Sequence, residues 1–245
     1  MTDPTPPAES SRAPIFNLPP VIVALIAVLV GIQAARDFLV TAATEADIVF
    51  SFAFIPARIT ESAVVTDVLP GGAGAEIWSF VTYAFLHADW SHLAINALWL
   101  AAFGSPLAWR FGTARFLLFS AAGAIGGAAM HLAIHPESLT PLVGASAAIS
   151  AHMAAASRFL FGTRGIGSAG YHRPAPPLVD VFRDSRVVIF LGIWFGMNLV
   201  FGLLGPETGL ASGAIAWEAH IGGFLVGLFL FPLFDPVTRH GRAAD

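Results

Sequence analysis

The chain has 245 residues, of which 56% are hydrophobic and 11% are charged. A soluble domain usually carries about a quarter charged residues, so these charges are too few to cover a water-exposed surface and we expect lipid to solvate most of it. The chain has no cysteine, which excludes disulfides, thiolate metal sites and thiol catalysis. Its net charge of −4 gives no basis for binding nucleic acid.

Six apolar runs predict the architecture. Because about 20 residues are needed to cross ~30 Å of hydrocarbon, we expect spans at 19–40, 91–109, 115–134, 142–161, 187–205 and 213–234. The predicted fold is an all-α polytopic membrane protein, a six-transmembrane-helix bundle over residues 19–234. Residues 1–18, rich in proline and polar side chains, are expected to be a disordered cytoplasmic lead, and 235–245 a cytoplasmic tail. Residues 41–90 are too broken by charge, proline and glycine to span, and whether they lie in the membrane or above it stays open.

The arginines predict the orientation. With the N-terminus inside, ten of the twelve arginines lie on the cytoplasmic side, and Arg36 and Arg58 lie outside. Cytoplasmic loops keep the positive charge, so both termini are predicted to be cytoplasmic. The membrane itself is predicted to be the inner membrane of a bacterium. The second, fourth and sixth spans then run from outside to inside, and their first residues share the outer leaflet.

Four polar residues gather at that level. His92 and Asn96 lie near the start of the second span, Ser146 near the start of the fourth, and His220 about seven residues into the sixth. At 1.5 Å per residue these groups lie within roughly 10 Å of the outer ends of their helices. Polar groups at membrane depth are costly and often functional.

Ser146 and His220 suggest a nucleophile and its base. Ser146 is surrounded by small residues, beginning with Gly144, and His220 precedes a GxxxG pair, Gly223 and Gly227. Small residues allow a close approach of neighbouring helices. The alternatives are a packing serine and a histidine that only bridges helices by hydrogen bonds.

His92 and Asn96 are four residues apart and share one helix face. With the backbone N–H of Ser146 they would suit an oxyanion hole, or they are a buried polar pair between helices. His87, Asp89, His131 and His135 are predicted to be solvated groups of the outer interface. No HExxH motif occurs, which argues against a zinc protease. A haem held by His92 and His220 would leave Ser146 and Asn96 without a role.

Three motifs in this order resemble the rhomboid family of intramembrane serine proteases. They are HxxxN at 92–96, GxS at 144–146 and AHxxGxxxG at 219–227, and the resemblance extends over roughly residues 19–234. It implies a Ser146–His220 dyad with no third carboxylate, and an oxyanion held by His92, Asn96 and the Ser146 N–H. It further implies that Gly144 keeps the nucleophile open, that no cofactor or metal is used, and that the substrates are transmembrane segments cut near their outer ends.

The chain departs from that pattern in four places. Ala147 stands where the family usually has glycine, Ser150 where some members have an aromatic residue, Ser79 where an arginine follows the loop tryptophan, and Ala108 in place of an acidic residue. An inactive relative that binds transmembrane segments therefore remains an alternative, and a histidine-ligated redox protein or transporter is a third. For the protease, we expect a water cavity capped by 41–90 or by 206–212, and a fifth span that tilts to admit substrate.

Overall fold

The computed structural model describes residues 18–61, 68–160, 173–208 and 216–237. Within these ranges the chain is helical apart from loops and one isolated β-bridge between Phe54 and Leu142, so the predicted all-α architecture is confirmed. The elements in chain order are α1 (Pro20–Phe38), α2 (Ala42–Phe52), α3 (Pro56–Thr60), η1 (Gly72–Gly74), α5 (Ala75–Thr82), η2 (Tyr83–Phe85), α6 (Trp90–Trp99), η3 (Leu100–Gly104), α7 (Ser105–Phe111), α8 (Thr113–Ile134), α9 (Ser146–Leu160), α10 (Leu178–Arg183), α11 (Ser185–Thr208) and α12 (Trp217–Phe234).

Three of the described helices, α1, α8 and α12, are long and apolar enough to cross a membrane, and residues 185–200 of α11 form a shorter apolar run. Large apolar side chains on these helices point away from the protein: Leu118, Ile193 and Phe229 are each about 60% exposed or more. A water-soluble protein rarely presents so much apolar surface. The helices therefore have the surface of an integral membrane protein.

The second predicted span is one helical run from Trp90 to Phe111, with a π-helical segment in its middle (η3). The Asp89 carboxylate starts it by accepting a hydrogen bond from the His92 amide, 2.8 Å away. Pro106 follows the π segment, and its missing N–H and its ring explain why the regular α-helical pattern is interrupted there. The predicted limits of 91–109 agree with the structure within two residues.

The fourth and sixth helices begin later than predicted. Helix α9 begins at Ser146 and not at 142, because Leu142 instead exchanges backbone hydrogen bonds with Phe54 (2.8 and 3.1 Å) and Gly144 has a positive φ of 117°. Helix α12 begins at Trp217, while residues 213–215 lie outside the described residues. His220 is consequently the fourth residue of its helix, about one turn from its start, and not seven residues in.

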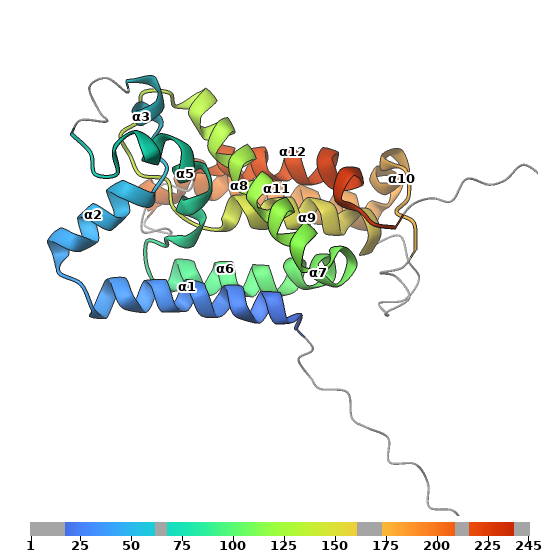
Figure 1. Ribbon diagram of the computed structural model, residues 1–245. Coiled ribbons are helices and arrows are strands. Elements are labelled where there is room, and N and C mark those ends of the chain that lie inside the picture. Colours follow the sequence, from blue (N-terminus) through green and yellow to red (C-terminus); the bar gives the residue numbers. More distant parts are fainter. Residues whose placement is uncertain (1–17, 62–67, 161–172, 209–215, 238–245) are drawn as a thin grey trace, which may run out of the picture.

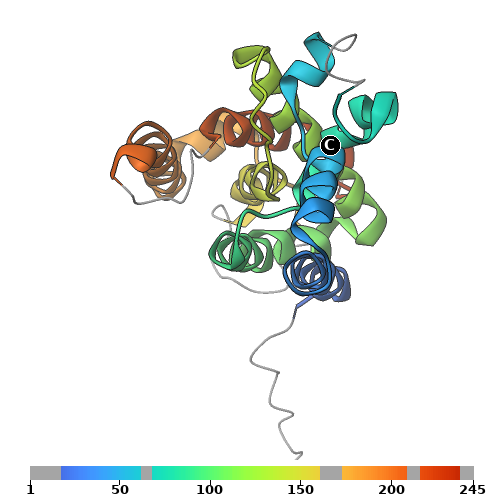
Figure 2. The same cartoon turned by 90° about the vertical axis from the view of Figure 1, so that its left-hand side faces the viewer.

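Helix α9 lies at the centre of the bundle, where Figures 1 and 2 show α8, α12 and the α6–α7 run around it. Its sequence is rich in alanine and nearly all of it is buried. At 15 residues it is about 22 Å long, too short to cross the hydrocarbon unaided. Because other helices enclose it, its polar ends need not reach lipid.

Glycines bring α12 into direct contact with α9 and α8. A Cβ at Gly223 would overlap the carbonyl group of Ala147, one at Gly227 the carbonyl of Ala151, and one at Gly222 the carbonyl of Gly126 on α8. These backbones therefore touch with no side chain between them, as small-residue motifs allow in membranes. The close approach sets the positions of the residues at the N-terminal ends of α9 and α12.

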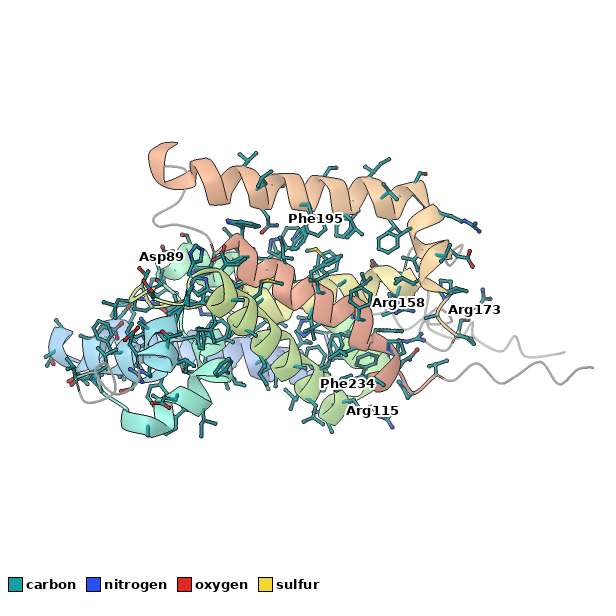
Figure 3. The ribbon with its side chains drawn as sticks, turned by 90° about the horizontal axis from the view of Figure 1, so that it is seen from above. Asp89, Arg115, Arg158, Arg173, Phe195 and Phe234 are labelled. Carbon is teal, nitrogen blue, oxygen red and sulfur yellow. The ribbon has the colours of Figure 1, made fainter. Side chains whose placement is uncertain are left out.

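Helix α11 meets α12 through aromatic rings. Trp194 stacks on Phe224 with ring centroids 5.2 Å apart, and Phe195 lies edge-on to the same ring at 5.1 Å. Figure 3 shows Phe195 on the side of α11 that faces α12. A second aromatic contact, Phe103 to Phe190 at 5.6 Å, joins α11 to η3.

Charged groups distinguish the two ends of the bundle. Arg115, Arg158 and Arg173 lie at one end in Figure 3, and Asp89 lies at the other. At the arginine end Arg110 forms an ion pair with Asp235 at 2.7 Å. The predicted orientation, with the arginine end cytoplasmic, stays a prediction.

The glycine contact predicts a difference between two alanine substitutions. Gly227→Ala places a methyl group on the Ala151 carbonyl, and should lower the free energy of unfolding by about 1–3 kcal/mol. Gly192→Ala on α11 meets open space and should cost nothing. Thermal melts of both variants in detergent would measure this, and equal melting temperatures would contradict the assigned contact.

Candidate active site

Ser146 opens α9 at the end of a strap, residues 141–145, that is held at two points. The Gly144 N–H donates to the Tyr83 carbonyl at 3.0 Å, and Leu142 forms the bridge to Phe54. The Tyr83 hydroxyl in turn donates to the Ala124 carbonyl of α8 at 2.8 Å. Residues of the 41–90 segment thus hold the strap before Ser146, and the capped water cavity stays a prediction.

Gly144 allows the ring of His92 to lie on the strap. An ideal Cβ at Gly144 would be 2.8 Å from both Nε2 and Cε1 of His92, and 3.8 Å from the Ser146 hydroxyl oxygen. The positive φ at Gly144 is a second reason for glycine. The structure therefore places His92 beside the serine, at the level that the sequence predicted.

His220 reaches Ser146 from α12. Its Nε2 is 2.7 Å from the Ser146 Oγ, and its Nδ1 is in hydrogen-bond contact with the Asn198 Oδ1 of α11. The Asn198 amide donates through Nδ2 to the Trp194 carbonyl at 2.8 Å, which turns its oxygen toward His220. A carbonyl oxygen only accepts, so Nδ1 carries the imidazole proton and Nε2 is the acceptor for the serine hydroxyl.

Sequence reasoning missed Asn198. It is the only amide or ionisable residue in the apolar run 187–205, and a polar group at membrane depth is itself a functional signal. The sequence predicted no carboxylate beside His220, and the Asn198 side chain that lies there is an amide. Asn198 lies where it can hold the ring of His220 in one tautomer.

Asn96 is buried, and its side-chain amide donates to the His92 carbonyl one turn earlier at 2.9 Å. The structure thus gives Asn96 a bond within its own helix and leaves its amide one further donor. His92 and Asn96 share the face of α6 as predicted.

Gly223 lies one turn after His220, against the Ala147 carbonyl next to the serine, and Gly227 repeats the contact one turn further. The structure also shows the contacts of Ala147 and Ser150, two departures from the resembled pattern. The Ala147 methyl lies against Gly127 of α8, where a Cβ would overlap it, and the Ser150 hydroxyl donates to the Ser146 carbonyl at 2.7 Å. Neither side chain comes between Ser146 and His220.

The outer-interface prediction was partly wrong. His87 is 1% exposed, and the Arg36 guanidinium donates to its carbonyl at 2.9 Å. Burial, with the neighbouring His92 and Arg36, lowers the pKa of His87 to about 3, so its ring is neutral.

His131 is also buried, and lies 2.6 Å from a carboxylate oxygen of Glu218. His135 is exposed, as expected. Of the other predicted cap, 206–212, residues 209–212 lie outside the described residues.

The arrangement has the parts of a nucleophilic site. A serine hydroxyl donates to a histidine whose other nitrogen is held by an amide, and the serine stands at a helix N-terminus, whose first N–H groups have no partner within the helix. The haem alternative fits poorly, since both ring nitrogens of His220 already have partners.

The strap predicts unequal effects at two glycines with positive φ. Gly144→Ala combines an unfavourable backbone conformation with contact against His92, whereas Gly112→Ala (φ +75°) has the backbone effect alone. We expect the unfavourable backbone conformation to lower the free energy of unfolding by on the order of 1–3 kcal/mol in both variants. Only Gly144→Ala should lose more, through its contact with His92. Thermal unfolding measures it, and equal losses would show that His92 does not lie on the strap.

A family model described as "Rhomboid domain" matches residues 74–235. The chain is 36% identical over 85 residues to rhomboid-related protein 3 of Homo sapiens, covering 33% of this chain and 20% of that protein. It is 29% identical over 162 residues to RHOMBOID-like protein 12, mitochondrial, of Arabidopsis thaliana, covering 60% of this chain and 44% of that one. The matched regions thus span less than half the length of either relative.

Proposed function

The chain belongs to the rhomboid family, and we propose that it is an intramembrane serine endopeptidase that uses Ser146 as nucleophile and His220 as base. The observation that carries the proposal is the 2.7 Å contact of Ser146 Oγ with His220 Nε2, on an imidazole whose Nδ1 faces Asn198. The family includes serine intramembrane proteases as well as inactive members.

In the proposed reaction, His220 Nε2 takes the hydroxyl proton as the Ser146 oxygen attacks the scissile carbonyl. The resulting imidazolium gives that proton to the leaving amine, and water then hydrolyses the acyl-enzyme with His220 again as base. Asn198 keeps the proton on Nδ1 throughout. An amide holds the ring by a hydrogen bond and adds no negative charge to offset the imidazolium, unlike the carboxylate of a triad.

The developing oxyanion is assigned to the side of Ser146 where His92 lies. The Ser146 N–H at the helix N-terminus, the His92 ring and the remaining Asn96 donor would stabilise it. Donors already in place are effective because they need no reorganisation during the reaction. The ring of His92 on Gly144 and the burial of Asn96 support this assignment.

The proposed membrane arrangement has six spans within residues 19–234. To the three spanning-type helices it adds the continuous run Trp90–Phe111, the enclosed α9 and the apolar α11. The proposed membrane is the inner membrane of a bacterium. Residues 1–18 and 235–245 are then cytoplasmic, and Ser146 and His220 lie toward the outer leaflet. The separation of arginines from Asp89 supports this orientation.

The proposed substrates are transmembrane segments of other membrane proteins, cut near their outer ends. A substrate helix would enter beside α11, which is attached to its neighbours by aromatic contacts. Phe190 meets Phe103 of η3, and Trp194 stacks on Phe224 of α12. Ring contacts can separate without breaking backbone hydrogen bonds. An active enzyme with α11 permanently crosslinked to α6 would count against this entrance.

Fluorophosphonate labelling tests the proposal directly. Detergent-purified wild-type protein should be labelled, and Ser146→Ala and His220→Ala should not, because the probe reacts with activated serines. No labelling of a folded wild type would favour the alternative of an inactive transmembrane-segment binder, which Ala147 and Ser150 motivate.

The Asn198 contact predicts a graded effect. Asn198→Ala should slow labelling about five- to tenfold, as expected from losing one hydrogen bond worth about 1 kcal/mol. Met197→Ala, at the exposed neighbouring position on α11, is the matched control and should label at the wild-type rate. An unchanged rate for Asn198→Ala would remove Asn198 from the site.

A further inference from the structure

Two histidines and one glutamate converge at the outer ends of α8 and α12. His131 and His135 are four residues apart in the last turn of α8 and its C-cap, and Glu218 is in the first turn of α12. One nitrogen of each histidine and a carboxylate oxygen of Glu218 lie within 4.8 Å of one another. His131 Nδ1 is 2.6 Å and His135 Nε2 is 3.5 Å from the same oxygen of Glu218.

We propose that these three residues form a binding site for a divalent transition metal, of which zinc is the best match. Two imidazoles and a carboxylate are a known type of three-residue zinc set, with a fourth position left for water. Nitrogen ligands argue against calcium and magnesium, which take oxygen ligands. This site departs from the expectation, drawn from the sequence, that no metal is bound.

The spacing of the ligand atoms suits such an ion. With metal–ligand bonds of about 2.0–2.2 Å in a tetrahedron, ligand atoms are about 3.3–3.6 Å apart. His135 and Glu218 already have this separation, and His131 must move from Glu218 by less than about 1 Å. The two histidine nitrogens, which lie within 4.8 Å of each other, must also approach by about 1 Å. A metal ion here would take the place of the direct hydrogen bond between His131 and Glu218.

The burial of Glu218 and the exposure of His135 also suit a metal site. Glu218 is 3% exposed, and a buried carboxylate needs compensating charge, which a dication supplies. The His135 side chain is 48% exposed, so an ion can enter from the outer side. The contact of Gly222 with Gly126 fixes α8 against α12 one turn further in, which holds the ligands ready.

The site is separate from the serine. Glu218 is two residues before His220, and two residues turn a helix by about 200°, so Glu218 faces α8 while His220 faces Ser146 and Asn198. The metal would therefore join the ends of α8 and α12 and take no part in the chemistry. The inference does not rest on the proposed protease activity.

Cobalt and zinc binding to the full chain tests the proposal. The protein is purified through a tag without histidines, stripped with a chelator and titrated with Co²⁺, whose visible d–d band reports tetrahedral coordination. Wild type and Ser146→Ala should each bind one equivalent, which Zn²⁺ displaces. His135→Ala and Glu218→Gln should bind at least about tenfold more weakly, since losing even an outer-shell partner costs 10–100-fold.

Glu137→Gln is the matched control, because Glu137 is an exposed acid two residues from His135 and outside the cluster. It should bind as wild type does. His135 is exposed, so His135→Ala should remain folded, and Zn²⁺ should raise the melting temperature of wild type and not of this variant. Absence of the tetrahedral band, or equal binding by His135→Ala, would leave a histidine–glutamate hydrogen bond without metal and overturn the proposal.

Discussion

The contact between the backbones of α9 and α12 is the feature on which the remaining geometry depends. Gly223 and Gly227 place α12 directly on the carbonyls of Ala147 and Ala151. Lipid offers no hydrophobic force to drive helices together, so close packing of small residues has to supply the attraction. Because Gly223 is one turn from His220 and Ala147 is adjacent to Ser146, the same contact that joins the helices also sets the distance between the His220 imidazole and the Ser146 hydroxyl.

The polar groups of the site hold one another in an apolar bundle. Trp194 orients Asn198, Asn198 orients His220, and His220 accepts from Ser146. An unpaired polar group would be costly at this depth, so each bond removes a penalty as well as fixing an orientation. On the other side of Ser146, Tyr83 and Phe54 hold the strap and His92 lies on Gly144. The segment between the first two long helices thus belongs to the site as a support for its backbone.

Much of this follows from the sequence, and the exceptions have physical reasons. Apolar runs gave the long helices within a few residues, and polar residues at equal depth brought Ser146, His220 and His92 together. The start of α9 was missed because Leu142 pairs with Phe54, a partner distant in sequence. The pairing of His131 with Glu218 depends on how α8 and α12 are rotated, which apolar helices of this kind do not encode in a periodic pattern. Asn198 left a visible signal, a lone amide in an apolar run, but its partner could be named only once the helices were packed.

The proposed function requires Ser146 to cleave peptide bonds within a membrane. The most direct measurement reconstitutes the protein in liposomes with a single-span reporter and identifies the products by mass spectrometry. We expect wild type to cut the reporter toward the outer end of its span, and Ser146→Ala to leave it intact. An intact reporter with folded wild type in liposomes, or a cut that persists in Ser146→Ala, would contradict it.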